Sequence, residues 1–157
     1  MKIFVSLGSN LKDRKANLLQ ALELIVKNHF VVVEKSPVYE SEAVDYLAQP
    51  DFLNQVLMLQ DKLNRDPDLL MKTFLEIEKQ LGRTRTISKG PRSIDIDILF
   101  LDSITINTQH LTVPHPEVFK RSFIMIPLLD LPSGKELMRH YHFSNEFDNS
   151  CWIFDEE

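Results

Sequence analysis

Two aspartates lie two residues apart in the most strand-like segment of the chain. Asp95 and Asp97 alternate with isoleucines over residues 94–98, and Leu99 and Phe100 follow. Side chains two apart on a β-strand share a face and lie about 6–7 Å apart along it. We therefore expect the isoleucines and Phe100 on one face and the two aspartates and Leu99 on the other. Carboxylates this close repel each other unless a cation lies between them.

Magnesium is the cation that such a pair would hold. Mg²⁺ prefers oxygen ligands and usually takes some of them from water and phosphate, and two such ions can clamp a phosphoryl group during its transfer. The plainer interpretation is that both aspartates lie on the solvated face of an amphipathic strand. Asp-x-Asp alone does not decide between the two, but aspartate is a poor strand former, which favours metal binding.

A basic block precedes the aspartates and supports the same interpretation. No acid lies between Glu78 and Asp95, and the bases in this interval are Lys79, Arg83, Arg85, Lys89 and Arg92. Arginine binds phosphate oxygens in bidentate fashion, and lysine adds a point charge. The alternative is a solvated loop with scattered charges, but one polyphosphate ligand would explain both the bases and the aspartates. The segment is not a P-loop, because no Gly-x-x-x-x-Gly-Lys-Ser/Thr occurs in the chain.

Composition limits the class of protein. The chain has 157 residues, of which 43% are hydrophobic and 26% charged, as expected for one globular domain. Its formal net charge of −5 argues against a general nucleic-acid binder. No apolar run approaches the ~20 residues that span a bilayer. The apolar segment at the N-terminus is too short for the hydrophobic region of a signal peptide. The single cysteine, Cys151, excludes an internal disulfide, so we expect a cytoplasmic protein.

The spacing of apolar and turn residues predicts an α+β fold. Strands are expected over residues 2–7, 31–39 (broken at Pro37), 52–60 and 93–101. One helix should follow the first strand and another the third. This order predicts a ferredoxin-like βαββαβ sandwich, an antiparallel sheet with helices packed on one face.

Helix ends and the last third of the chain carry further signals. Asn10 is expected to cap the first helix, and Asp66-Pro67 to open the second, which Gly82 ends. Residues 104–106 are expected to pair with strand 93–101 as a short hairpin, and residues 114–129 to be helical in pieces, interrupted at Pro127. Residues 143–157 receive no element and no function. The whole chain, 1–157, is predicted to be one domain with a C-terminal hairpin and helices.

Five segments resemble a known enzyme family. Residues 90–99, Gly-Pro-Arg-Ser-Ile-Asp-Ile-Asp-Ile-Leu, resemble the signature of the 6-hydroxymethyl-7,8-dihydropterin pyrophosphokinases, and residues 111–116, Leu-Thr-Val-Pro-His-Pro, resemble its second motif. Residues 7–11, 49–55 and 121–123 agree with the family in order and spacing. The resemblance covers about residues 2–130 and does not extend to the tail.

The resemblance implies an activity and a set of residues. Enzymes of this family act in folate biosynthesis, where they transfer pyrophosphate from ATP to the hydroxymethyl group of the pterin and release AMP. It implies two Mg²⁺ ions on Asp95 and Asp97, and phosphate contacts from Arg83 and Arg92. The other residues implied at the ATP site are Arg85, Lys89, Ile98, Thr112, His115 and Arg121. The residues implied at the pterin site are Ser41, Val44, Phe52, Asn54 and Phe123, with the two phenylalanines on either side of the ring.

Several of these residues also have simpler explanations. Phe52 and Phe123 would also suit an ordinary core, and His115 could cap a helix. Asn54 within a strand is harder to explain without a ligand, because a buried amide needs partners. The resemblance implies that Glu78 lies near the ATP side, but it could also be plain helix surface, and it is left out of the predicted site.

Four positions depart from the pattern of the family. The resemblance implies tryptophan, a polar residue, arginine and tyrosine at positions where this chain has, in order, Lys89, Leu75, His110 and Pro116. These differences concern ATP affinity and loop closure, and leave the expected metal ligands and pterin residues in place.

Two other functions fit part of the pattern. A polymerase-β-type nucleotidyltransferase also carries Asp-x-Asp on a strand, but its Gly-Ser pair closely precedes the aspartates, whereas Gly8-Ser9 lies far from them in this sequence. A non-catalytic ferredoxin-like module for RNA would need basic and aromatic residues along its strands. This chain is acidic, and its clearest strand carries two aspartates instead. We therefore expect a monomeric enzyme whose partners are ATP and the pterin, without nucleic acid or membrane.

Overall fold

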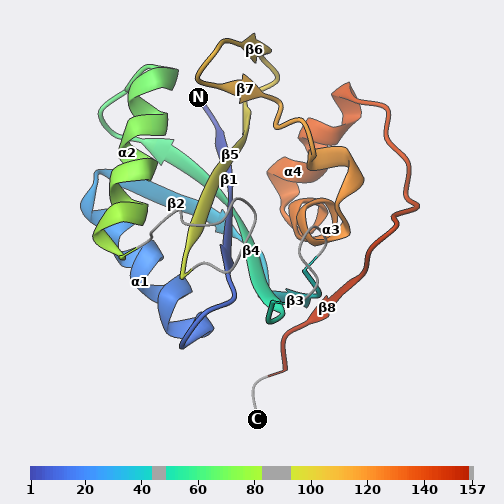
Figure 1. Cartoon of the computed structure of the whole chain (residues 1–157). Coiled ribbons are helices and arrows are strands. Elements are labelled where there is room, and N and C mark those ends of the chain that lie inside the picture. Colours follow the sequence, from blue (N-terminus) through green and yellow to red (C-terminus); the bar gives the residue numbers. More distant parts are fainter. Residues whose placement is uncertain (44–48, 83–92, 156–157) are drawn as a thin grey trace.

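A six-stranded antiparallel sheet runs through the centre of the computed structural model, which describes residues 1–43, 49–82 and 93–155 (Figure 1). Strand β4 lies between β1 on one side and both β2 and β3 on the other, while β5 flanks β1 and β8 flanks β3. The strands are β1 (Ile3–Ser9), β2 (Phe30–Lys35), β3 (Tyr39–Ser41), β4 (Phe52–Asp61), β5 (Asp95–Leu101) and β8 (Cys151–Ile153). The predicted α+β class is confirmed.

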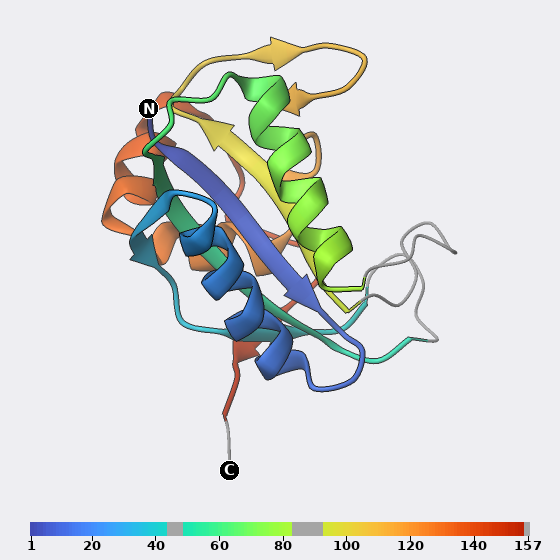
Figure 2. The same ribbon diagram turned by 90° about the vertical axis from the view of Figure 1, so that its left-hand side faces the viewer.

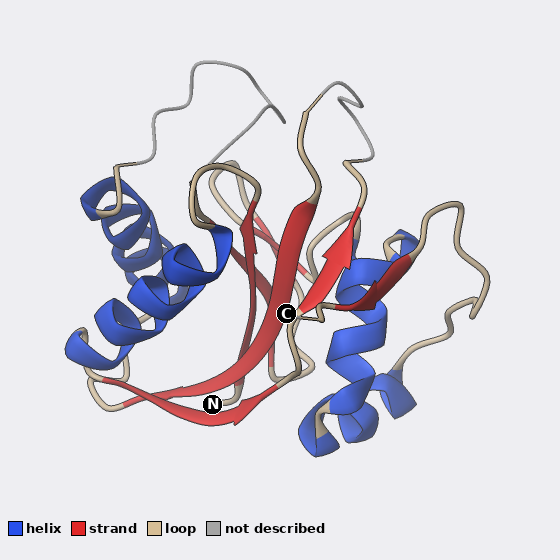
Figure 3. Ribbon diagram, turned by 90° about the horizontal axis from the view of Figure 1, so that it is seen from below, coloured by secondary structure: helices blue, strands red, loops and turns tan. Residues whose placement is uncertain are grey.

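Helices cover both faces of the sheet. Helices α1 (Arg14–Lys27) and α2 (Pro67–Gln80) lie side by side on one face (Figure 2), and α3 (Ser122–Asp130) and α4 (Pro132–Leu137) lie on the other (Figure 3). The expectation of helices on one face only is wrong. Phe4, Val56 and Met58 point away from α1 and α2 and are buried in a second apolar cluster with α3 and α4, so this face also needed a cover.

Strand β5 contains a bulge that changes the face of its last residues. Val5 of β1 pairs with Ile98, and Phe4, which precedes Val5, pairs with Phe100. Leu99 has no pairing partner in β1 and is therefore the extra residue of the bulge. Leu99 and Phe100 consequently both lie in the cluster on the α3 side, whereas Leu101 returns to the α1–α2 side. The expectation that Phe100 shares a face with the isoleucines is therefore wrong.

The predicted caps are confirmed for the second helix and wrong for the first. The side chain of Asp66 accepts from the Leu69 amide of α2, Pro67 occupies the first turn, and Gly82 follows the helix with φ of 80°. In α1 the cap is Asp13, whose side chain accepts from Ala16 N at 3.1 Å.

Asn10 has a different contact from the predicted cap. Its Nδ2 donates to Gln49 Oε1 at 2.8 Å and to the Pro50 carbonyl at 3.0 Å. Asn10 thus ties the start of α1 to the segment that leads into β4.

The strand predicted over residues 31–39 is two strands. Strands β2 and β3 both pair with β4, and Ser36 lies between them. The Ser36 hydroxyl accepts from Val56 N at 3.0 Å and the Ser36 carbonyl accepts from Gln55 Nε2 at 2.8 Å. The side chains of Ser36 and Gln55 therefore supplement the backbone bond from Ser36 N to the Val56 carbonyl at 2.9 Å, next to the interruption at Pro37.

The segment after β5 also differs from expectation. Strand β6 (Ile106–Asn107) pairs with β7 (Thr112–Val113) and not with β5. After a 3-10 turn, η1 (Val118–Lys120), helix α3 continues through Pro127 without interruption, and a second turn, η2 (Met138–His140), follows α4. Among the described residues, no helix combines the length and apolar character needed to cross a bilayer.

Candidate active site

Asp95 and Asp97 lie on one face of β5, as predicted. Both are half-exposed, whereas the alternating Ile94, Ile96 and Ile98 are buried against α1 and α2. In the neighbouring strand their register partners are Gly8 and Ser6. The carboxylates therefore lie on the α3 side of the sheet, in a row with two of the smallest side chains.

Gly8 is the point where the expected metal and pterin residues meet. It pairs with Asp95 on one side and with Asn54 on the other. A Cβ at Gly8 would lie 3.8 Å from Asn54 Oδ1, 3.8 Å from the Phe52 ring and 3.9 Å from Asp95 Cβ. Three predicted site residues from two different strands therefore lie within van der Waals distance of the position that a side chain at residue 8 would occupy.

Asn54 is buried and has a fixed orientation. Only 6% of it is exposed, and its Nδ2 donates to the hydroxyl of Ser41 at 2.9 Å across the β3–β4 pair. Ser41 is 1% exposed. This bond leaves Asn54 Oδ1 on the Gly8 side, so the side chain of Ser41 orients Asn54.

Phe52 and Phe123 differ from the core phenylalanines. Phe4, Phe30 and Phe100 are at most 1% exposed, whereas Phe52 and Phe123 are only half-buried. The Arg121 guanidinium lies 5.7 Å from the centre of the Phe123 ring. Their partial exposure leaves ring surface that a ligand could contact. Phe119, Phe143, Phe147 and Phe154 are also half-buried, and Phe123 packs against the apolar cluster on the α3 side, so exposure alone does not assign the role.

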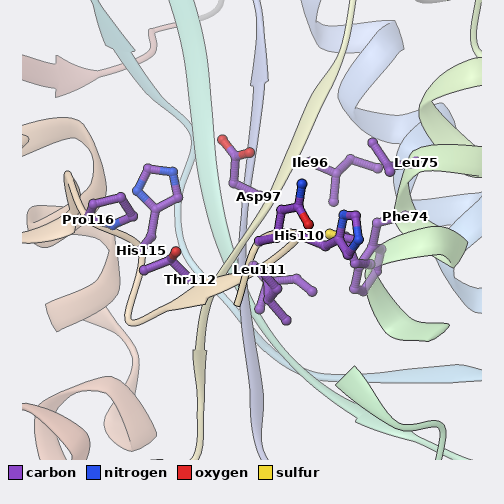
Figure 4. Close-up of a pocket in the computed structure, with 12 residues that line it drawn as sticks. Phe74, Leu75, Ile96, Asp97, His110, Leu111, Thr112, His115 and Pro116 are labelled. Atoms are coloured by element: carbon purple, nitrogen blue, oxygen red, sulfur yellow. The ribbon is translucent and has the colours of Figure 1, made fainter. Parts of the chain in front are cut away.

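A pocket of about 530 Å³ lies along the free edge of β5 (Figure 4). Phe74 of α2 lines one side of the pocket, and Thr112 and His115 line the other. Asp97 and Ile98 of β5 form its floor. The two residues expected beside adenine, Ile98 and Thr112, therefore share one cavity with an expected metal ligand.

Three of the four positions that depart from the family pattern line this same pocket. Leu75, His110 and Pro116 are among its walls (Figure 4). The differences are therefore concentrated in the cavity at the β5 edge and are absent from the residues around Gly8.

His115 is held as a neutral side chain at the pocket wall. Its backbone N donates to the Leu99 carbonyl at 3.0 Å, and its ring Nδ1 accepts from Glu117 N at 3.2 Å. Burial lowers the pKa of His115, and the positive charge of Arg121 lowers it further, against the opposing effect of Asp95 and Glu117. Because Nδ1 is an acceptor, the proton of the neutral ring is on Nε2, which can donate to a ligand.

Glu78 is a site-supporting residue that the sequence analysis misplaced. It is 2% exposed, and its Oε2 accepts from Ile96 N at 2.7 Å. The amide of Ile96 points out of the free edge of β5, so this bond ties α2 to the strand between the two aspartates. The signal was present in the sequence: Glu78 follows Phe74 by four residues and therefore lies on the buried stripe of the helix.

Five predicted site residues lie outside the described part of the chain: Val44, Arg83, Arg85, Lys89 and Arg92. Their expected roles stay predictions. Among the residues that the structure does describe, no group of three or more histidine, cysteine or acidic side chains could hold a metal. The pair Asp95 and Asp97 nevertheless suits Mg²⁺, which is commonly held by one or two carboxylates together with phosphate oxygens.

Polar groups that converge beside a pocket of mixed polar and apolar lining are typical of small-molecule sites in enzymes. Comparison with known proteins identifies the enzyme class. Residues 4–133 match the family model described as 7,8-dihydro-6-hydroxymethylpterin-pyrophosphokinase (HPPK). The chain therefore belongs to this family, which confirms the resemblance and the predicted ATP-dependent pyrophosphokinase class.

Relatives differ in how much of their length the chain matches. The 2-amino-4-hydroxy-6-hydroxymethyldihydropteridine pyrophosphokinase of Aquifex aeolicus is 41% identical over 158 residues, which covers 96% of either chain. The Bacillus subtilis protein of the same description is 40% identical, over 82% of this chain and 76% of that protein. The folic acid synthesis protein fol1 of Pneumocystis carinii is 42% identical, but the chain spans only 17% of its length.

Solved structures agree on the fold. A Plasmodium falciparum HPPK-DHPS triple mutant crystallised with pteroate superposes with a TM-score of 0.63 at 15% identity, covering 82% of this chain and 39% of that one. At this identity the likeness concerns the fold alone.

The buried Glu78 bond predicts a stability effect. Glu78→Ala leaves the Ile96 amide without this acceptor and should lower the free energy of unfolding by about 1–3 kcal/mol, measured by urea denaturation. Glu78→Gln retains an acceptor oxygen and should lose less. Glu76→Ala, an exposed glutamate on the same helix, is the matched control, and an equal loss from Glu76→Ala would contradict the supporting role of Glu78.

The lowered pKa of His115 predicts a pH effect. In the folded chain His115 takes up its proton at lower pH than in the unfolded chain, whose ordinary value is 6.5. Its neutral form therefore contributes stability that is present above this value and is lost as the pH falls below it. Urea denaturation at pH 7.5, 6.5 and 5.5 should show a smaller loss for His115→Gln than for the unsubstituted chain. Identical losses would show that His115 does not titrate differently on folding.

Proposed function

We propose that this site transfers the pyrophosphoryl group of ATP to the hydroxymethyl oxygen of 6-hydroxymethyl-7,8-dihydropterin and releases AMP, a step of folate synthesis. The observation that carries the proposal is the junction at Gly8. Asp95 lies on one side of this glycine, and Asn54 and Phe52 lie on the other. An acceptor held on the Asn54 side would present its reacting group to phosphates held on the Asp95 side.

The pterin is assigned to the space bounded by Asn54, Phe52 and Phe123. A fused polar ring needs aromatic contacts on its faces and hydrogen bonds at its edge. The two half-exposed phenylalanines supply the former, and the buried Asn54, oriented by Ser41, supplies the latter. Val44 would contribute from the loop that follows Ser41.

ATP is assigned to the pocket along β5. The Ile96 amide points out of this edge toward Glu78, and backbone groups two residues apart on a strand point the same way. The amide and carbonyl of Ile98 are therefore available to the edge of adenine, beside Thr112. His115 Nε2 and the Arg121 guanidinium are the described donors assigned to the phosphates.

Asp95 and Asp97 are assigned as the ligands of two Mg²⁺ ions. Bound there, the ions would neutralise charge on the phosphates of ATP and on the departing AMP. The half-exposed carboxylates and the missing side chain at Gly8 leave room for phosphate oxygens next to them.

The reaction requires no covalent bond between a substrate and a side chain of the protein. The hydroxymethyl oxygen forms a bond to the β-phosphorus, the bond from that phosphorus to the oxygen of the α-phosphate breaks, and the hydroxyl proton passes to water. Positioning of the two substrates and stabilisation of charge account for most of the rate in such transfers. The bases Arg83, Arg85, Lys89 and Arg92 are assigned to the phosphates, with Arg92 acting on the charge that develops during transfer.

The finer features of the protein are part of the same proposal. The strand order β5-β1-β4 followed by β2 and β3 supports the ferredoxin-like βαββαβ class. We take residues 1–157 as a single domain, acting as a monomer in the cytoplasm on ATP and the pterin. The single cysteine and the acidic composition support these assignments.

Removal of one aspartate should abolish catalysis without unfolding the chain. Asp97 is half-exposed, so Asp97→Ala should keep the circular dichroism spectrum and lower kcat by at least about a thousandfold. Asp68→Asn, an exposed substitution on α2, is the control and should keep full activity. An Asp97→Ala protein that still turns over in proportion to added Mg²⁺ would refute the metal assignment.

The basic residues before β5 should contribute unequally. Arg92 is assigned to the developing charge and can bind phosphate in bidentate fashion, whereas Lys89 adds a single point charge. Arg92→Ala should therefore lose about a hundredfold or more in kcat, and Lys89→Ala should lose far less. Equal losses in steady-state assays would count against these roles.

A further inference from the structure

The C-terminal tail contacts the turn that precedes α3. Asn149 lies 27 residues after Ser122, and its Oδ1 accepts from Ser122 N at 2.8 Å and from the Ser122 hydroxyl at 2.6 Å. Its Nδ2 donates to the Lys120 carbonyl at 3.2 Å. One side chain therefore binds both sides of Arg121.

This contact supplies what the sequence at the start of α3 lacks. The first amides of a helix have no partner within the helix and are usually capped by a serine, threonine, aspartate or asparagine directly before it. The residue in that position is Arg121, whose side chain makes no capping bond. Asn149 supplies the missing acceptor from a distant part of the chain.

The tail is anchored at a second place, on the strand that carries Ser41. Strand β8 pairs with β3, with Cys151 opposite Ser41. Trp152 Nε1 donates to Glu40 Oε1 at 3.2 Å, and the Phe154 amide donates to the Val38 carbonyl at 2.9 Å. The tail thus connects β3, whose Ser41 binds Asn54, to the start of α3, which carries Phe123.

We propose that Asn149 is a positioning residue for substrate binding, acting through the turn that presents Arg121 and Phe123. The bonds to Lys120 and Ser122 fix the backbone on both sides of Arg121 and one residue before Phe123. The inference rests on the roles proposed above for Arg121 at the phosphates and Phe123 at the pterin. Residue 149 lies outside the matched range of 4–133, so family membership alone does not imply it.

Direct binding measurements test this inference. Dissociation constants of the full chain for the pterin alcohol and, separately, for ATP with Mg²⁺ are to be measured by calorimetry well below the unfolding temperature. Asn149→Ala should weaken both by roughly tenfold, the effect of a small displacement of binding groups. Asn149→Asp keeps the acceptor for Ser122 and places a negative charge at a helix N-terminus, so it should restore most of the affinity.

A matched control separates positioning from general destabilisation. Asn28→Ala also removes an asparagine bond to a backbone carbonyl, that from Nδ2 to Leu24 at the end of α1 at 2.7 Å, and should leave both dissociation constants unchanged. If Asn149→Ala does not fold, Ser122→Ala removes one of the two Ser122 bonds and should weaken binding in the same direction.

Two results would overturn the role of Asn149. One is an Asn149→Ala protein that binds both ligands within twofold of the unsubstituted chain. The other is an Asn28→Ala protein that loses as much affinity as Asn149→Ala. An unsubstituted chain that binds neither ligand would instead overturn the proposed function on which the inference rests.

Discussion

Strand β5 has to hold two like charges side by side at the edge of a sheet, and several features of the chain make this possible. Ile94, Ile96 and Ile98 bury the opposite face of the strand against α1 and α2. Glu78 binds the outward-pointing Ile96 amide between the two aspartates. Gly8, in the neighbouring strand, places no side chain next to Asp95. The strand is thus fixed through its buried face and its edge, while Asp95 and Asp97 stay half-exposed on the opposite face.

The α3 side of the sheet changes from apolar to polar along β1, β4 and β5, one register step later on β4, where Val56 of the apolar cluster pairs with Ser6. On β1 the change runs from Phe4 to Gly8, and on β4 from Met58 to Asn54. On β5 it runs from the bulged Leu99 to Asp97. Helices α3 and α4 cover the apolar part, and the substrates are proposed to bind at the polar part. The second helical layer therefore both completes the core and sets the boundary of the site.

Much of the site could be read from the sequence because local patterns determine it. The alternation of residues 94–98 correctly predicts that Asp95 and Asp97 share one face of the strand. The pair Asp66-Pro67 correctly predicts where α2 begins. The bulge at Leu99 depends on pairing with a distant strand, so it does not follow from local pattern. The spacing of Glu78 from Phe74 predicts that Glu78 is buried, but its bond to Ile96 depends on how α2 packs against β5. The structure of the tail could not be predicted from its own sequence for the same reason. Strand β8 forms only by pairing with β3, and Asn149 makes its bonds only to the turn before α3.

The identity of the transferred group tests the account most directly. The chain should be incubated with ATP, Mg²⁺ and 6-hydroxymethyl-7,8-dihydropterin, and the products followed by phosphorus NMR and chromatography. The account predicts AMP and the pterin diphosphate in equal amounts, and no products when Mg²⁺ is omitted. Release of pyrophosphate with transfer of AMP, as by a nucleotidyltransferase, or binding without any turnover, would contradict it.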